Sequence, residues 1–439
     1  MKAGIDIEFF QSERPDDIEK GKLFIDDDGK DYIEFRKKGI GHYSLIKAIF
    51  AKGLDSGEKY TLINCVFRQS EGSSCRYTIN ELYKGDHISI STENNCFEVE
   101  ASMTGLTNWI NLPRIIPEFA FSNSEDSTIT IKNSVEKSFN IPYNTILEIS
   151  EFCGGIYDKN ETILRNKSSI KITSQQPVSR IELHKNIMAF AKLLSVFTDT
   201  PVALISERFS FQSSKTVEYL SVREVKGQTE YQNDALLKFD KIEENWQTVL
   251  DIFYGDRDKF TRVLDLFIES VKNRTPEVSF LNITTAFEVF HKEFLEKNNK
   301  SIRQELFDEL KGANLISRDT KKWDQIIRYF HLMKMTGHIE FFKQNFLNPL
   351  KTVALLRASR NYYTHYTNPN EEIWTPNRLL FANKALRQLL KGVILLQLEI
   401  PSNLINKLLN NRAAVFYQDY ENNEYSLLYT NSEGAFAPI

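Results

Sequence analysis

The sequence predicts an α+β protein of more than one domain, with an antiparallel, β-rich amino-terminal domain followed by an all-α helical bundle. Its length of 439 residues exceeds that of one ordinary domain. In the first half apolar and polar residues alternate, which is the period of strands; in the second half apolar residues recur every three or four positions, which is the period of helices. A composition of 41% hydrophobic and 26% charged residues is typical of globular proteins and excludes wholesale disorder.

Short strands account for most of the first half. The alternation is clearest in five runs: Ile5–Phe9, Tyr32–Phe35, Ile88–Ser91, Phe97–Glu100 and Ile129–Lys132. Between the first two runs, Asp26–Lys30 has the composition of a hairpin turn. Because no helical pattern separates these runs, we expect an antiparallel sandwich or barrel. One helix is expected over Ile181–Phe197, followed by strands at Val202–Phe209 and Val217–Val222.

Near residue 235 the period changes to that of helices. The helical stripes cover six segments: Trp246–Phe253, Val263–Val271, Phe280–Leu295, Trp323–Phe330, Leu347–Tyr366 and Leu379–Leu398. Asp256 is placed to cap the second of these helices, and Pro349 places the start of the fifth near Asn348. We therefore predict a β-rich domain over residues 1–235, a helical bundle over 236–400 and a carboxy-terminal extension over 401–439.

Charge is distributed unevenly along the chain. The net charge is −4, so no overall basic field indicates a nucleic-acid-binding protein. Residues 241–439 hold 26 basic and 24 acidic residues, net +2, which leaves 29 basic and 35 acidic residues, net −6, in residues 1–240. Residues 321–400 hold 12 basic and 5 acidic residues. A solvated surface is the common explanation of such a count, and a phosphate-bearing partner is the alternative.

Several classes of protein are not expected. Acidic residues occupy the start of the chain, where a secretory signal needs an apolar run, and the apolar stretch Gly392–Leu398 is too short to span a membrane. We therefore expect a cytoplasmic protein with no membrane partner. The four cysteines lack the paired spacing of a zinc site, so buried thiols are expected. Neither a phosphate-loop motif nor His-Glu-x-x-His occurs, and we expect no metal and no cofactor.

Polar residues gather at the end of the helix that follows Pro349. Arg357, Asn361 and His365 are four apart and share one face, whereas Arg360 lies about 140° around the helix from His365. A guanidinium binds phosphate through a fixed fork of donors, and an imidazole transfers protons near neutral pH. Such a set could cleave RNA without a metal. From the residues alone, a helix end at which Arg360 and His365 merely complement the dipole is equally acceptable.

A family resemblance favours the catalytic interpretation. The segment Arg360–His365, Arg-Asn-Tyr-Tyr-Thr-His, resembles the R-N-x-x-x-H signature of HEPN ribonucleases. The earlier segment Leu281–His291 resembles the helix of ApeA-like HEPN domains that carries an Ala-Phe-Glu-x-x-His pattern. A β-rich domain before such a bundle also resembles the ApeA anti-phage proteins. The predicted bundle is therefore expected to be of HEPN type.

The resemblance implies a role for each matching residue. Arg360 would bind the phosphate and His365 would transfer the proton. Asn361 would orient one of these two side chains, and Glu288 would be an acidic support residue. Arg357 and Tyr363 are further candidates for support. His291 is expected to be structural. Tyr363 and its tyrosine neighbours could stack bases, but packing is the commoner use of such a cluster.

The implied function is a metal-independent endoribonuclease of anti-phage defence that acts by abortive infection. Members of the family dimerise through the helix that carries the Arg-Asn-x-x-x-His motif, so a second or further copy of the chain is an expected partner. The other expected partners are RNA, with tRNA as one candidate, and a phage trigger protein. The amino-terminal domain would sense or restrain. Two alternatives stay open: a non-catalytic HEPN scaffold for dimerisation or nucleotide binding, and a ligand-binding β-sandwich with a helical oligomerisation domain.

Overall fold

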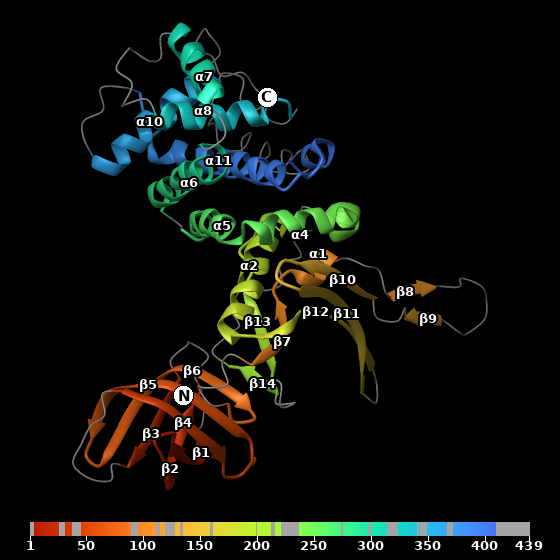
Figure 1. Cartoon of the computed structure of the whole chain (residues 1–439), viewed down its shortest axis with the longest axis vertical. Helices are drawn as coiled ribbons and strands as arrows, with labels where there is room; N and C mark the ends of the chain where they lie inside the picture. Colours follow the sequence, from red (N-terminus) through yellow and green to blue (C-terminus); the bar gives the residue numbers. More distant parts are fainter. Residues whose placement is uncertain are drawn as a thin grey trace. The chain divides into compact units, whose positions relative to one another are not determined.

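A computed structural model of the chain describes most of it in two compact units (Figure 1). The first comprises residues 1–191 and 202–234, and the second comprises residues 192–201 and 235–439. The described residues are 4–25, 31–36, 45–88, 95–110, 115–118, 128–131, 135–158, 161–198, 200–211, 216–220, 237–273, 275–296, 300–313, 324–339, 342, 349–366 and 372–409. Among them, no helix combines the length and the apolar character that crossing a bilayer requires.

Six antiparallel strands form a closed barrel at the start of the first unit. They are β1 (Ile5–Gln11), β2 (Arg14–Phe24), β3 (Tyr32–Arg36), β4 (Leu45–Gly53), β5 (Lys59–Glu71) and β6 (Ser74–Gly85). Their order is β6-β3-β2-β1-β4-β5, and β5 also pairs with β6, which closes the ring. Closure pairs every strand on both sides, so the barrel has no free edge.

Apolar side chains that alternate with polar ones along these strands fill the barrel. In β1 and β3 the alternating residues Ile7, Phe9 and Ile33 are at most 1% exposed. Aromatic rings pack inside, with the Phe9 and Phe35 centroids 5.0 Å apart. The side chains of three of the four cysteines are described, and all three are buried free thiols, as the sequence predicted: Cys65, Cys75 and Cys96.

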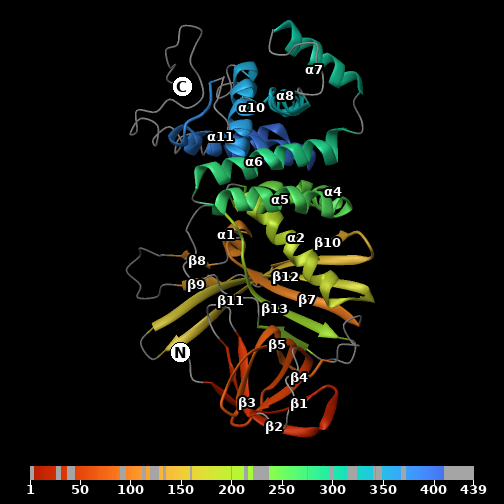
Figure 2. The same ribbon diagram turned by 90° about the vertical axis from the view of Figure 1, so that its left-hand side faces the viewer.

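A second set of strands continues from the barrel as an open sheet. It contains β7 (Cys96–Met103), β10 (Val135–Ile141), β11 (Thr145–Asp158), β12 (Glu161–Val178), β13 (Leu204–Phe211) and β14 (Thr216–Tyr219), in the order β10-β11-β12-β7-β13-β14. Helix α1 (Leu106–Ile110) follows β7, and a separate hairpin comprises β8 (Ile115–Glu118) and β9 (Thr128–Ile131). Helix α2 (Arg180–Thr198) lies across the sheet (Figure 2) and packs Leu183, Ile187 and Phe190 inward.

The predicted β-rich class is confirmed, and the barrel is one of the two architectures expected. The strands at either side of Asp26–Lys30 pair antiparallel, Phe24 opposite Tyr32, whereas residues 26–30 themselves lie outside the described residues. The strand predicted at Ile88–Ser91 is not formed at Ile88, which follows the end of β6, and residues 89–91 are not described. The long strands β4, β5, β6, β11 and β12 were not among the strands that the alternation predicted.

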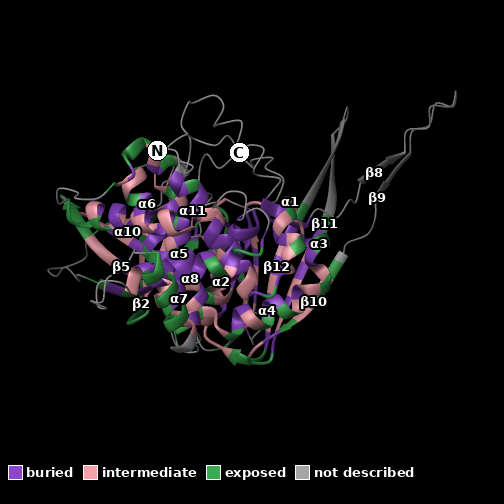
Figure 3. Ribbon diagram, turned by 90° about the horizontal axis from the view of Figure 1, so that it is seen from above, coloured by how far each residue is buried: buried purple, intermediate pink, exposed green. Residues whose placement is uncertain are grey.

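The second unit is helical, as predicted. Its helices are α3 (Phe239–Ile242), η2 (Glu243–Asn245), α4 (Trp246–Gly255), α5 (Arg257–Lys272), α6 (Pro276–Phe290), the π-helix η3 (His291–Leu295), α7 (Lys300–Gly312), α8 (Asp324–Thr336), α10 (Pro349–His365) and α11 (Pro376–Gln397). Residues 402–409 of the predicted extension are also helical. Figure 3 shows buried and exposed positions alternating along these helices.

Helix α6 is central, because it contacts α5, α8, α10 and α11. Its buried face includes Phe280, Ile283 and Phe287. Helix α10 begins at Pro349 as predicted. The predicted cap at Asp256 is correct in position only: its carboxylate does not cap α5 and instead accepts a hydrogen bond of 2.5 Å from Lys259 Nζ.

Candidate functional site

Helix α10 carries the polar cluster that the sequence singled out. Its first turns bury Val353 and Leu356, whereas its last turns expose Asn361 and His365. The helix remains α-helical through His365, and Tyr366 ends it with φ +49° and a 2.6 Å hydrogen bond from its N–H to Tyr362 O. Because this last turn is regular, Arg360 and His365, which are five residues apart, keep the angular separation of an ideal helix, about 140°.

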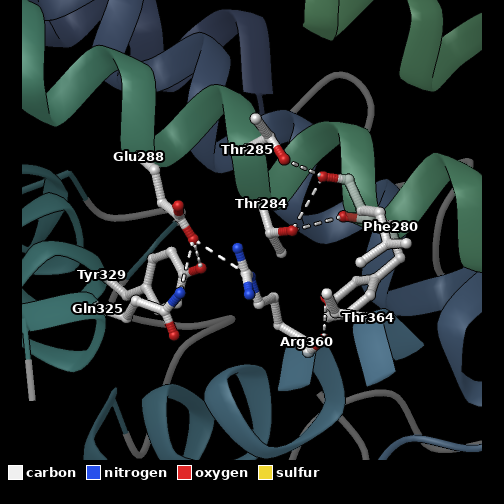
Figure 4. Close-up of polar contacts among 9 residues, drawn as sticks. Phe280, Thr284, Thr285, Glu288, Gln325, Tyr329, Arg360 and Thr364 are labelled. Carbon is white, nitrogen blue, oxygen red and sulfur yellow. Dashed lines mark hydrogen bonds and ion pairs between the residues drawn. The ribbon is translucent and has the colours of Figure 1, made fainter. Parts of the chain in front are cut away.

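The Arg360 side chain points from α10 toward α6 (Figure 4). Its Nε lies 3.4 Å from Oε1 of Glu288, and both side chains are largely shielded, with 22% and 19% exposed. The same Oε1 accepts a hydrogen bond of 2.8 Å from the Tyr329 hydroxyl and one of 3.3 Å from Gln325 Nε2. Three donors from two other helices, α8 and α10, therefore converge on one carboxylate oxygen of α6.

Burial determines the chemistry of this cluster. Burial, followed by the charge and hydrogen bond of Glu288, raises the pKa of Tyr329 well above its ordinary value. The Tyr329 phenol therefore remains a neutral hydrogen-bond donor at any working pH. Glu288 in turn fixes Arg360 with one nitrogen toward the carboxylate, which leaves the other guanidinium nitrogens as donors for an anion. Glu288 and Arg360, two residues singled out from the sequence, are thus in contact.

The other predicted residues are placed differently. Asn361 and His365 are exposed on the face of α10 that also carries the half-buried Arg357. In the described part of the chain, the contacts join Arg360 to Glu288 and not to His365. One copy of the chain thus presents a half-buried guanidinium and an exposed imidazole on different sides of the same helix.

Tyr363 is a packing residue. It is 4% exposed, its hydroxyl donates a 2.8 Å hydrogen bond to Trp374 O, and its ring meets Phe280 edge to face. Burial raises the pKa of Tyr363 to about 12. Its neighbours differ: Tyr362 is half-buried and Tyr366 is 70% exposed. These contacts favour packing for Tyr363 itself and leave Tyr366 as the accessible ring of the cluster.

His291 also packs inside the unit. Its Nε2 lies 3.2 Å from His331 Nδ1, and burial together with the His331 charge lowers the pKa of His291 to about 3. His338, seven residues after His331, forms a hydrogen bond with Ser402 instead. Among the described residues, no group of three or more His, Cys, Asp or Glu side chains could hold a metal ion.

Sequence reasoning missed Tyr329 and Gln325. Both lie on α8, within the segment Trp323–Phe330 that the sequence predicted to be helical. No local pattern marks either residue as a partner of Glu288, because the contact is made between helices that are distant in sequence.

The family described as ApeA N-terminal domain 1 matches residues 7–251, and the family described as Apea-like HEPN matches residues 281–404. The second match contains α8, α10 and the part of α6 from residue 281 onward, and hence the whole Glu288–Arg360 cluster. Comparison with curated proteins gives no match.

One solved structure is similar over part of the chain. It is described as "MrkH, A novel c-di-GMP dependence transcription regulatory factor", with 11% sequence identity over 43% of this chain and 85% of that one. The TM-score is 0.14, too low to carry any argument about fold or function.

Proposed function

The chain belongs to the ApeA family, and from that premise we propose that it is an endoribonuclease effector of anti-phage defence, acting in the cytoplasm. The observation that carries the proposal is that α10 of the HEPN bundle holds the Arg360 guanidinium against Glu288 and also exposes Asn361 and His365. An Arg held by one carboxylate oxygen loses little side-chain freedom when it binds a phosphate, so its remaining donors are pre-organised.

The roles of the residues follow from their chemistry. Arg360 binds the scissile phosphate and stabilises the charge that develops on it. His365 transfers a proton from the 2′-hydroxyl or to the leaving oxygen. Asn361 orients the side chain of either Arg360 or His365. Attack by the 2′-hydroxyl breaks the bond between phosphorus and the 5′-oxygen, leaving a 2′,3′-cyclic phosphate and a 5′-hydroxyl. None of these steps requires a metal ion.

The active form is a dimer or a higher oligomer. Arg360 and His365 are about 140° apart around the regular helix α10. One copy therefore does not present both the guanidinium and the imidazole to one phosphate. A two-fold axis beside α10 would bring the His365 of one copy toward the Arg360 of the other. RNA, with tRNA as one candidate, would bind across that composite cleft.

The first unit regulates this activity. Residues 1–240 carry a net −6 and residues 241–439 a net +2, so an acidic unit can screen a basic RNA site until a phage trigger displaces it. A bias of about 2.7 kcal/mol toward the restrained state suffices to lower basal activity roughly a hundredfold.

The test compares wild-type protein with His365→Ala and His338→Ala. His338 is a matched control, because it is another exposed histidine of the same unit, contacting Ser402 rather than α10. Total RNA from cells that express wild type or His338→Ala should run as degraded on a gel, whereas total RNA from cells that express His365→Ala should be intact. Purified wild type should retain cleavage in EDTA and leave cyclic phosphate ends. RNA that is equally degraded with His365→Ala would refute the assignment.

A mixing experiment tests the composite site. Arg360→Ala and His365→Ala chains should each be inactive, whereas a mixed dimer should contain one intact Arg-His pair and recover part of the activity. Recovery should be absent when either variant is mixed with itself. A monomer in light scattering that cleaves at the full rate would contradict the proposal.

A further inference from the structure

A row of serines crosses four neighbouring strands in the open sheet of the first unit. Ser150 of β11 is opposite Ser169 of β12, and their hydroxyl oxygens are 2.8 Å apart. Ser102 of β7 is opposite Ser206 of β13, with hydroxyls 2.7 Å apart. The two pairs are joined because β12 and β7 are neighbours.

This serine row is on the outer face of the sheet. The alternate residues, among them Ile149, Ile170 and Ala101, point to the other face and are at most 2% exposed. The row therefore does not belong to the hydrophobic core. Four small side chains in line leave room above the sheet that larger residues would fill, and a cavity of about 570 Å³ is present there. This volume is in the range of small-molecule sites, about 300–1,000 Å³.

A ladder of alternating charges borders the serine row on one side. Along it Lys171 is paired with Glu148 at 2.6 Å, and Arg208 with Glu100 at 3.7 Å, while Glu218 is opposite Arg208 on β14. Glu100, Arg208 and Glu218 line the cavity. Because acids and bases alternate, this border has no excess positive charge with which to hold a polyanion such as an RNA strand.

The other border has different chemistry. Phe152 of β11 is opposite Lys167 of β12, and both line the cavity. Phe152 is 62% exposed, so its ring face is available to a planar partner. Lys167 is exposed as well, and no ion pair involving it occurs in the described part of the chain. The cavity thus combines an exposed aromatic ring, an exposed ammonium group, a row of hydroxyls and carboxylates.

We propose that this cavity binds a single nucleoside phosphate. The base would stack on Phe152, because every nucleobase has a π-face that an exposed ring can cover. The ribose hydroxyls both donate and accept, and so they match serine hydroxyls and the Glu100 carboxylate. The phosphate would pair with Lys167. The proposal concerns the first unit only and does not depend on RNA cleavage by the second.

The test is calorimetric titration of the full-length protein with AMP, GMP, CMP and UMP. The four matching nucleosides, ribose 5-phosphate and inorganic phosphate are the comparison ligands. At least one mononucleotide should bind saturably with one site per chain, and tighter than its nucleoside or ribose 5-phosphate. Saturable binding of none of the four mononucleotides would overturn the proposal, and so would equal affinity for ribose 5-phosphate, since the base would then contribute nothing.

Variants locate the site and separate it from the proposed RNA cleft. Phe152→Ala should weaken binding about tenfold, and Phe152→Tyr, which keeps the ring, should stay within about twofold. Ile18→Ala is the matched control, since Ile18 is 61% exposed on the barrel, and it should bind as wild type. Loss of binding in Arg360→Ala, with Phe152→Ala unaffected, would place the ligand in the helical unit and overturn the proposal.

The lysine gives a second, independent readout. Lys167→Gln should remove most of the preference for a mononucleotide over its nucleoside, while nucleoside affinity stays within about twofold. Lys52→Gln changes an exposed lysine of the barrel strand β4 and should leave that preference intact. An unchanged preference in Lys167→Gln would show that the phosphate is held elsewhere and would refute the arrangement.

Discussion

Replacing Glu288 by Gln tests the cluster that holds Arg360. The amide is isosteric and keeps an oxygen that can accept from Tyr329, but it removes the negative charge 3.4 Å from Arg360 Nε. The variant therefore isolates the electrostatic part of the interaction from its packing. It should destabilise the helical unit and loosen the Arg360 side chain.

The magnitude follows from distance and burial. At 3.4 Å and an effective dielectric constant of about 20, the Coulomb attraction is about 5 kcal/mol. Desolvation of two groups that are about four-fifths buried offsets much of this, and hydrogen bonds to charged groups contribute about 1.5–3 kcal/mol net. We expect Glu288→Gln to lower the free energy of unfolding by about 2 kcal/mol. For a unit of this size, that corresponds to a decrease in Tm of about 4–8 °C.

The assay is thermal and urea unfolding of the full chain, with Glu293→Gln as control. Glu293 pairs with Arg262 at 3.0 Å, but 59% of the Arg262 side chain is exposed, so this loss should be about 0.5 kcal/mol. A double-mutant cycle of Glu288→Gln with Arg360→Gln should give a coupling energy above about 1 kcal/mol. Equal losses for Glu288→Gln and Glu293→Gln, or a coupling energy near zero, would refute the reasoning.

Three further predictions concern stability. Because burial and the His331 charge lower the pKa of His291 to about 3, below its unfolded value, wild type should lose stability as the pH falls from about 6.5 toward 3, by up to about 1.4 kcal/mol per pH unit; His291→Asn should show a shallower slope in urea titrations at pH 7, 6 and 5. Gly85→Ala should destabilise the first unit by about 2 kcal/mol or more in thermal unfolding, since its φ is +122° and a Cβ would lie 2.6 Å from Thr216 O; a shift below about 0.5 kcal/mol would contradict this. Tyr363→Phe should lower the free energy of unfolding by about 1–2 kcal/mol, because it removes the hydroxyl that donates a hydrogen bond to the Trp374 carbonyl. An unchanged urea midpoint would argue against this.

Local patterns in the sequence were sufficient for the class of each half and for the motif helix. The alternation at Ile5–Phe9 became β1, and the stripe that starts near Pro349 became α10, with Arg360, Asn361 and His365 in its last turns. Side-chain period is a property of neighbouring residues, so it can be read along the chain. The family also followed from short segments, because each of its two motifs is a continuous stretch of about six to eleven residues, Leu281–His291 and Arg360–His365.

Pairings between distant segments were decided only by the tertiary structure. Closure of the barrel depends on β5 meeting β6, and the serine row exists only because β11, β12, β7 and β13 are neighbours in an order that the sequence does not follow. The contact of Glu288 with Tyr329 requires α6 and α8 to pack at one register. Such contacts arise from the burial of whole faces against one another, and that burial depends on how the entire unit folds rather than on any one segment.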